Sequence, residues 1–155
     1  MATTQEELDS KRIYSTLKKV VSDLVQNYGC DDDAMKMEFC VESEPFEVTF
    51  KLSVHPNSQL LTLYSKLNFT VAEEYRDAYA RAICELNYDR MYEATFDFSP
   101  TKGFTVFRVP ILFRKSIISP ELIDKAVRYT FAIVNKYTPY LYDLSHGVEA
   151  VMPEE

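Results

Sequence analysis

The sequence is poor in the residues that most active sites and metal sites require. Its 155 residues include only 3 glycines, 2 histidines and 3 cysteines, and there is no tryptophan. Three glycines are too few for a phosphate-binding loop, and no GxSxG, GxGxxG or P-loop motif occurs. Two histidines and three scattered cysteines do not give a zinc set with the usual spacing. The sequence therefore predicts no enzyme, no metal and no other cofactor.

Basic stripes and long apolar runs are also missing. The formal net charge is −7, and no basic stripe offsets it, so phosphate backbones would be repelled and nucleic-acid binding is excluded. No run approaches the roughly 18 apolar residues of a membrane span, and the start MATTQEELDS has no apolar signal region. Three cysteines without CxxC spacing fit a reducing compartment. We expect a cytoplasmic protein without a nucleic-acid or membrane partner.

The residues that are present describe one α+β domain. Apolar residues make up 46% of the chain and charged residues 26%, which are globular values. Residues 6–28 carry an apolar stripe at helical spacing, and Gly29 follows where a helix-ending glycine belongs. Three alternating runs follow at 34–42, 46–54 and 60–69, with turns at 43–45 and 55–58. They predict three antiparallel strands, because a period of two puts all apolar side chains on one face.

The second half of the chain predicts two further helices and two further strands. Thr70 and Glu73 fit a capping box for a helix that ends near Asn87. An alternating run at 92–98 and a run at 104–114 that is apolar on both faces flank a hairpin loop at 99–103. Pro110 in the second run indicates a bulge or an edge position. Ser119 and Pro120 are typical first residues of a last helix, which Pro139 should end, kink or restart. The predicted order is α-β-β-β-α-β-β-α, a five-stranded antiparallel sheet with helices packed on it.

This order resembles the type III secretion chaperone-like fold, and within it the YbjN-like family, described as bacterial sensory-transduction regulators. The resemblance lies in the long first helix, in the hairpin MYEATFDFSPTKGFTVFRVPILF and in the last helix SPELIDKAVRYTFAIVNKYTPYLYDLSHG. It covers residues 6–147, which we predict to be a single domain, and leaves residues 148–155 as an acidic tail. For secretion chaperones the fold implies a homodimer and a sheet surface that holds a client segment. The YbjN-like branch implies no defined biochemical activity and no functional residues.

Apolar residues on the sheet face that alternation assigns to solvent are the candidate binding residues. Leu60 and Tyr64 lie opposite the core set of the third strand, and Phe104, Val106 and Leu112 lie opposite the core set of the fifth. Exposed apolar patches often mark protein–protein surfaces, so we predict that another protein binds here. A sheet covered on both faces would instead bury these residues. The alternatives to a protein-binding adaptor are a dedicated secretion chaperone for one client, and a small-ligand sensor or enzyme with an unrecognised pocket.

Two further clusters have structural explanations. Asp31, Asp32 and Asp33 are consecutive and cannot all face one cation, so we interpret them as a solvated acidic turn. Near its end the last helix carries tyrosines at positions 137, 140 and 142, which we expect to cover the core. A client contact is the alternative for these tyrosines. Cys84 is expected to be a small buried side chain.

Overall fold

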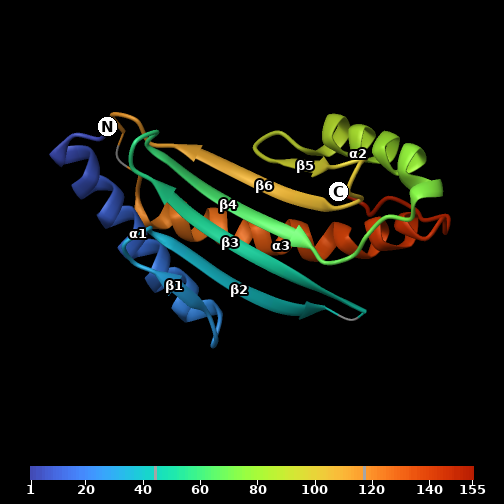
Figure 1. Cartoon of the computed structure of the whole chain (residues 1–155), viewed down its shortest axis with the longest axis horizontal. Coiled ribbons are helices and arrows are strands. Elements are labelled where there is room, and N and C mark those ends of the chain that lie inside the picture. The colour runs from blue at the N-terminus through green and yellow to red at the C-terminus, as the bar shows by residue number, and fades with distance from the viewer. Residues whose placement is uncertain (44, 117) are drawn as a thin grey trace.

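The computed structural model describes residues 1–43, 45–116 and 118–155 (Figure 1). Its elements in chain order are α1 (Thr4–Leu24), β1 (Gly29–Asp31), β2 (Lys36–Ser43), β3 (Phe46–His55), β4 (Leu60–Leu67), the 3-10 turn η1 (Glu73–Tyr75), α2 (Arg76–Arg90), β5 (Thr95–Phe98), β6 (Thr105–Leu112) and α3 (Pro120–Ser145). The predicted turn at 43–45 includes position 44, which lies outside the described residues.

The strands form one antiparallel sheet with the order β1-β2-β3-β4-β6-β5. The predicted α+β class and antiparallel sheet are confirmed, but the prediction of five strands was wrong because β1 adds a sixth. This strand has only three residues, all exposed, so it lacks the apolar alternation by which a strand is recognised. It pairs Gly29 with Glu38 and Asp31 with Lys36 at the outer edge of β2.

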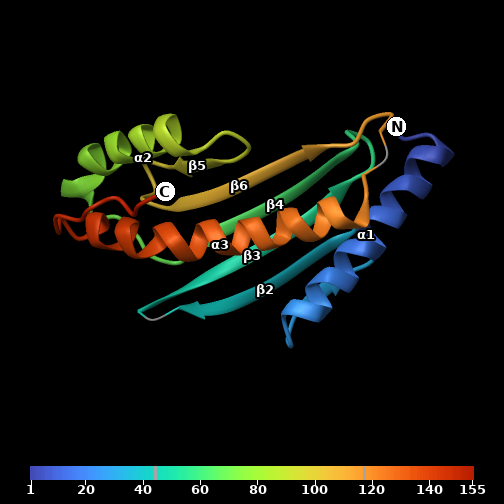
Figure 2. The ribbon, with the colours of Figure 1, turned by 180° about the vertical axis from the view of Figure 1, so that it is seen from behind.

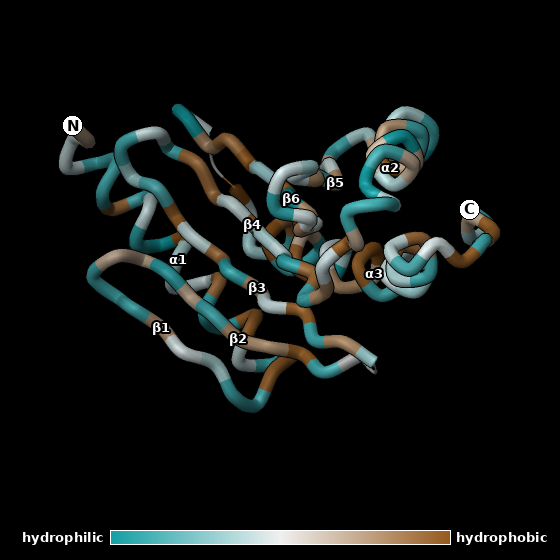
Figure 3. Tube along the Cα trace, turned by 45° about the vertical axis from the view of Figure 1, so that its right-hand side comes forward, coloured by the Kyte–Doolittle hydropathy of each residue, from teal (hydrophilic) through white to brown (hydrophobic). Residues whose placement is uncertain are grey.

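Helices α1 and α3 pack on one face of the sheet, and the opposite face carries no helix among the described residues (Figures 1 and 2). Alternation along the strands sends apolar side chains to the helix side, as the alternating burial along β3 and β4 shows. Figure 3 colours the chain by hydropathy, with hydrophobic residues in brown. The core contains fully buried residues from every layer, including Leu17, Leu52, Leu63, Phe107 and Val127. This sandwich of two layers leaves an open sheet face for contacts with other molecules.

Helix α1 begins and ends at different residues from those predicted. Thr3 is its N-cap and forms a capping box with Glu6: the Glu6 amide donates to Thr3 Oγ1, and the Thr3 amide donates to Glu6 Oε2. The helix ends at Leu24, because Val25 is already extended. Gly29 is therefore not its terminal glycine, as predicted, but the first residue of β1. The segment between α1 and β1 also packs partly on the core, through Val25 and Tyr28.

The capping box predicted at Thr70 and Glu73 does not form. Ala72 precedes η1, Tyr75 precedes α2, and neither accepts a side-chain capping bond. Instead, the chain before α2 is fixed by Arg76, whose guanidinium donates to the carbonyls of Val71, Pro100 and Thr101. The helix runs on to Arg90, three residues beyond the predicted end.

Helix α3 starts as predicted and then continues through its internal proline. Ser119 Oγ accepts the Leu122 amide at 3.1 Å, and Pro120 occupies the first turn. Pro139 neither ends nor restarts the helix, which runs to Ser145. The Thr138 hydroxyl donates to the Val134 carbonyl just before the proline, which keeps a side-chain bond where the main-chain ladder is broken.

The end of α3 is closed by Gly147. The Gly147 amide donates to the Leu144 carbonyl and the Val148 amide to the Asp143 carbonyl, the paired bonds of a Schellman motif. Gly147 has φ +72°, in the left-handed region, and a Cβ placed there would lie 2.4 Å from the Tyr75 ring. Beyond it, Met152 packs partly on the core, and Glu155 Oε1 lies 3.7 Å from Arg90 Nε.

The β5–β6 side of the sheet has an edge with few free main-chain groups. Pro110 pairs with Thr62 of β4, and the β4–β6 register has no bulge, which leaves the edge position of the two predicted alternatives. The Phe113 amide donates to the Gln59 carbonyl on the β4 side, so by alternation the Pro110 nitrogen faces away from β4. Strand β5 begins at Thr95, opposite Arg108, and does not reach Pro110. The Asn87 amide side chain of α2 bonds both main-chain groups of Phe96, on the outer side of β5.

Candidate functional site

The five predicted binding residues lie together on the open face of the sheet. The β4–β6 register places Leu60 opposite Leu112 and Lys66 opposite Val106, and Tyr64 lies between these pairs on the same face. Leu112 is 69% exposed, and the other four are half-buried. Phe104 lies just before β6, beside Lys66. Strand alternation alone was enough to place this cluster, which we name the β4–β6 patch (Leu60, Tyr64, Phe104, Val106 and Leu112).

Cationic side chains surround the β4–β6 patch. Lys66 Nζ lies 3.9 Å from the centre of the Phe104 ring, and the Arg108 guanidinium lies 5.9 Å from the centre of the Tyr64 ring. Arg108 also forms an ion pair with Asp97 at 3.3 Å. The aliphatic stems of these side chains extend the apolar surface, while their charges stay in water. The patch can therefore take an apolar side chain of a partner and hydrogen-bond its polar neighbours.

A second candidate site is a groove on the opposite side of the sheet, which the sequence did not reveal. It has a volume of about 680 Å³ and lies between the end of α1, strands β2 and β3, and the middle of α3. Its lining is mainly apolar: Leu24, Val25, Val41, Val48, Phe50, Phe131, Ala132 and Val134. Gln26, Asn27, Cys40, Glu42, Asn135 and Thr138 supply polar atoms. We name it the α1–β2–α3 groove.

The groove exists because α1 stops early. Phe39 and Phe50 stack with their ring centres 5.1 Å apart, and Phe131 of α3 packs edge-on to both, which closes the core at that point. Two residues further along β2, Val41 points to the same side but remains 39% exposed, because the chain after Leu24 does not continue as a helix over it. The sequence places Val41 in the core, whereas the structure leaves it exposed. This exposure could not be predicted without knowing that α1 ends at Leu24.

The main chain of β2 is unpaired beside this groove. The Met35 carbonyl accepts the Val54 amide from β3, so odd-numbered residues of β2 face β3 and even-numbered residues face outward. Strand β1 pairs with residues 36–38 only. The outward amides and carbonyls of Cys40 and Glu42 therefore have no main-chain partner in the described part of the chain. This is a short free sheet edge that opens directly onto the α1–β2–α3 groove.

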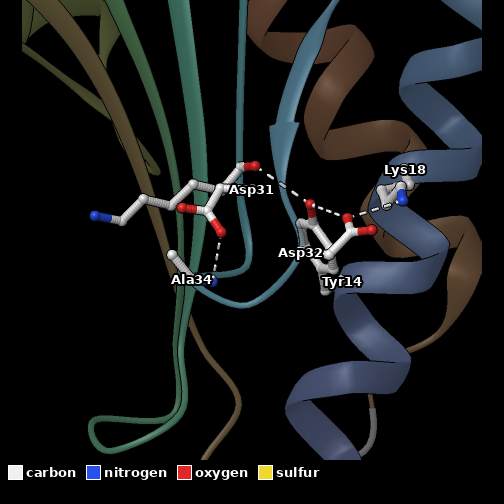
Figure 4. Close-up of polar contacts among 6 residues, drawn as sticks. Tyr14, Lys18, Asp31, Asp32 and Ala34 are labelled. Atoms are coloured by element: carbon white, nitrogen blue, oxygen red, sulfur yellow. Dashed lines mark hydrogen bonds and ion pairs between the residues drawn. The ribbon is translucent and has the colours of Figure 1, made fainter.

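The acidic turn after β1 is hydrogen-bonded to side chains of α1 (Figure 4). Lys18 Nζ and the Tyr14 hydroxyl both lie 2.9 Å from Asp32 Oδ1. These two bonds hold the pKa of the Asp32 carboxyl below its usual value, and the bond to Asp32 raises the pKa of the Lys18 ammonium. Burial and the bond to Asp32 raise the pKa of the Tyr14 phenol. Asp31 instead accepts the Ala34 amide across the turn.

Groups capable of metal or nucleophilic chemistry do not gather in the described residues. No three His, Cys, Asp or Glu side chains there could hold one metal ion together. His55 bonds Thr62, and His146 bonds Ser145 at the end of α3. All three cysteines are free and exposed, so the expectation of a buried Cys84 was wrong, because it lies on the outer side of α2. No described helix combines the length and apolar character of a membrane span.

The three tyrosines near the end of the last helix, Tyr137, Tyr140 and Tyr142, cover the core as expected. Tyr137 is buried, with its ring centre 6.2 Å from that of Phe96. Tyr142 packs against Phe46 and Phe69 at 5.3 and 5.5 Å between ring centres. Burial raises the pKa of the Tyr140 phenol, which is half-buried in the same layer. Their role in this structure is packing.

The architecture is the type III secretion chaperone-like α+β fold. A chain of the ExsC-ExsE complex, known from its crystal structure, superposes on it with a TM-score of 0.61. The match covers 91% of this chain and 97% of that one at 12% sequence identity, which shows a shared fold. No protein-family model matches the sequence, and no curated protein matches it.

Proposed function

We propose that the chain is a non-enzymatic protein-binding module, a chaperone-like or regulatory adaptor of the YbjN type that works in the cytoplasm of a bacterium. The observation that carries the proposal is the β4–β6 patch, because it gathers apolar side chains from neighbouring strands on a sheet face that no described element covers. The structural neighbour supports the proposal, since its crystal structure is that of a complex, ExsC-ExsE.

The partner is a protein segment that places an apolar side chain between Tyr64 and Leu112. A dedicated chaperone would hold one client there, and an adaptor would hold several. The similarity to a fold that includes dedicated chaperones supports the first of these, and a homodimer of the chain belongs to the same proposal. A small-ligand sensor is the alternative, and the α1–β2–α3 groove, with a volume of about 680 Å³ and a mainly apolar lining, is the pocket that such a sensor would use.

Affinity capture of the tagged chain from its own cells, followed by mass spectrometry, tests this proposal. Leu60→Asp and Val106→Asp should each remove the captured partner, because each puts a charge into an apolar contact. Tyr88→Asp is the matched control: Tyr88 is 88% exposed on α2, so the same charge is added away from the patch. Circular dichroism must show that all three variants are folded.

The outcomes separate the alternatives. One partner in stoichiometric yield, lost in both patch variants, supports a dedicated chaperone. Several partners lost together support an adaptor. If no protein is captured by the expressed chain, or if the captured proteins remain bound to both patch variants, the proposed use of the open face is wrong.

A further inference from the structure

We propose that the β4–β6 patch binds an acidic amphipathic helix of a partner protein, which lays its apolar stripe along β4 and β6 and points its carboxylates at Lys51, Lys66 and Arg108. The inference rests on the proposed function, because it names the conformation and the charge of the segment that the open face would hold. It adds the prediction that these three cations decide which segments bind.

The first observation is the set of cationic side chains around Tyr64. The strand register places Lys51 of β3 directly opposite Tyr64 on one side and Arg108 of β6 directly opposite it on the other. Lys66 lies two residues further along β4 and therefore points to the same face. Lys51 and Lys66 form no ion pair among the described residues, so both charges are available to a partner.

The carboxylates of the open face do not cancel these charges. Asp97 pairs with Arg108 at 3.3 Å, and Glu38 lies opposite Lys51 on β2. On β3, β4 and β6 themselves, the described open face carries three cations and one carboxylate, Glu47, which lies at the far end of β3. The net charge of −7 belongs to the whole chain, and charges beyond a Debye length of about 8 Å are largely screened. The nearby cations therefore favour an acidic partner.

The second observation is that the main chain under the patch is already used. Every residue of β4 from Leu60 to Leu67 is paired with β3 on one side and with β6 on the other. A segment that lies on this face finds no main-chain partner in these strands, so its own amides and carbonyls must be satisfied within it. A helix does this. From Leu60 to Lys66 the strand rises about 20 Å, which a helix of about 14 residues spans.

Aromatic rings beside cations also occur on sheets that bind single-stranded nucleic acid. Here the details favour a peptide. Lys66 Nζ lies 3.9 Å from the centre of the Phe104 ring, so this face of the ring is not free for a base to stack on. Leu60, Val106 and Leu112 offer aliphatic surface for apolar side chains. The net charge of −7 opposes a phosphate backbone more than a helix with a few carboxylates.

A second copy of the chain matches this face less well. A two-fold contact between two open faces would bring the same surface of each copy together. Lys51, Lys66 and Arg108 of one copy would then lie near those of the other, and like charges in contact are unfavourable. An acidic partner helix turns the same cations into attractive contacts.

The test uses fluorescent helical peptides of about 16 residues, titrated with the full chain in an anisotropy assay. The acidic peptide has a leucine stripe flanked by glutamate. A second peptide has lysine in place of glutamate, and a third has the acidic composition in an order that breaks the stripe. We expect saturable binding of the acidic peptide and at least about tenfold weaker binding of the other two. Added salt should weaken the acidic peptide, because these charges are exposed.

Three single variants assign the effect to the cations. Lys51→Glu and Lys66→Glu should each weaken the acidic peptide by at least about fivefold, because each replaces an attraction with a repulsion. Lys11→Glu is the matched control: Lys11 is exposed on α1, on the other side of the sheet, and the same change of charge there should leave binding unchanged. Thermal unfolding of the three variants checks that the fold is retained.

Several results would overturn the inference. They are no saturable binding of the acidic peptide up to about 1 mM, equal binding of the acidic and lysine peptides, or unchanged binding by Lys51→Glu and Lys66→Glu. Binding of a single-stranded oligonucleotide instead of the acidic peptide would assign the face to nucleic acid. A dimer in sedimentation that Leu60→Asp dissociates would assign it to a second copy.

The capture experiment separates a failure of this inference from a failure of the proposed function. If a cellular partner is lost with Leu60→Asp but retained by Lys51→Glu and Lys66→Glu, the open face binds a protein and the predicted preference for acidic segments is wrong. If the partner is retained by all three variants, the proposed function itself is wrong. Loss of the partner in all three, with Lys11→Glu unaffected, supports both.

Discussion

Gly147 stands where the structure leaves no room for a side chain. Its φ of +72° belongs to the left-handed region, and the Tyr75 ring occupies the space that a side chain would need. The Schellman bonds that close α3 depend on this conformation. The Tyr75 ring, which belongs to η1, lies directly against Gly147. The absence of a side chain at position 147 therefore lets η1 approach the end of α3.

We expect Gly147→Ala to lower the free energy of unfolding by more than about 1 kcal/mol, because it adds both backbone strain and a clash with Tyr75. Urea denaturation measures the change. Gly29→Ala is the matched control: Gly29 has no left-handed φ, and a Cβ there would lie 3.7 Å from the nearest atom, the Glu38 carbonyl oxygen. Equal losses in the two variants would contradict this explanation.

Asp32 should make stability depend on pH. Its carboxyl pKa is lowered in the folded chain by the bonds from Lys18 and Tyr14, so its contribution is present above the ordinary aspartate pKa of about 4 and is lost as the pH falls through the lowered value. The Lys18 pKa is raised, so its contribution is present below about 10.5 and is lost as the pH rises through the raised value.

Urea denaturation of the wild type and of Asp32→Asn at several pH values tests this. We expect the wild type to be the more stable at pH 7, with the difference shrinking in acid well below pH 4. Asp33→Asn serves as the control, since Asp33 is an exposed neighbour in the same turn. A difference between the wild type and Asp32→Asn that persists unchanged into strong acid would show that the Asp32 charge is not responsible.

At the scale of the helices, Thr3 and Thr70 allow a direct comparison between a threonine that caps a helix and one that does not. Thr3 accepts the Glu6 amide at the start of α1, whereas the predicted cap at Thr70 makes no capping bond to η1 or α2. Thr3→Ala should therefore lower the free energy of unfolding by about 1 kcal/mol, and Thr70→Ala should cause no comparable loss. Thermal denaturation of the two variants decides it, and the reverse order would mean that the cap lies where the sequence alone places it.

Pro139 interrupts the hydrogen-bond ladder of α3 without ending the helix. Its ring is exposed, so a substitution removes little packing. An alanine would restore the bond to the Asn135 carbonyl, and an internal proline costs a helix about 3 kcal/mol relative to alanine. Alanine would also raise the conformational entropy of the unfolded chain, which lowers the expected gain in the free energy of unfolding by less than about 1 kcal/mol. We expect Pro139→Ala to raise the urea midpoint, and a lowered midpoint would contradict the expectation.

The elements that the sequence predicted well are those with a strong local period. Strand β3 alternates without a break from Phe46 to Val54, and the structure reproduces this pattern. Strand β1 was not predicted because it has three residues and all of them are exposed. A strand of this kind at the edge of a sheet shows no alternation of apolar and polar residues. The capping box predicted at Thr70 was wrong for another reason: a threonine followed three residues later by glutamate occurs at both Thr3 and Thr70, and only tertiary contacts decide which one is used.

For the whole molecule, the sheet should open from β1 inward. Strands β3 and β4 have neighbours on both sides and residues in the core, whereas the three residues of β1 are exposed. Amide protection in native-state exchange should therefore be highest in β3 and β4 and lowest in β1. NMR-detected exchange measures it residue by residue. Protection at Cys30 as high as at Phe50 would mean that β1 belongs to the stable centre.

The two candidate sites differ in how far the sequence could predict them. The β4–β6 patch follows from a period of two, because alternation along the strands is sufficient to fix the face on which Tyr64 and Val106 lie. The groove depends on where α1 stops and on how the fold brings together Val25, Val41 and Phe131, which are far apart in the chain and line it. No local pattern contains that information, so only the folded chain shows it.

Pro110 and Asn87 set a limit on how this sheet can grow. On the β5–β6 side, the proline offers no amide to an incoming strand, and Asn87 already uses the outward groups of Phe96. Among the residues that the structure describes, the β2 side presents unpaired main-chain groups at Cys40 and Glu42. A polymer that grows by strand pairing needs two pairing edges on every subunit. A subunit with one pairing edge cannot bind a further copy once that edge is occupied. Assemblies built by strand addition therefore stop at fixed stoichiometry, and a concentrated solution of the folded chain should not elongate into fibres by edge pairing.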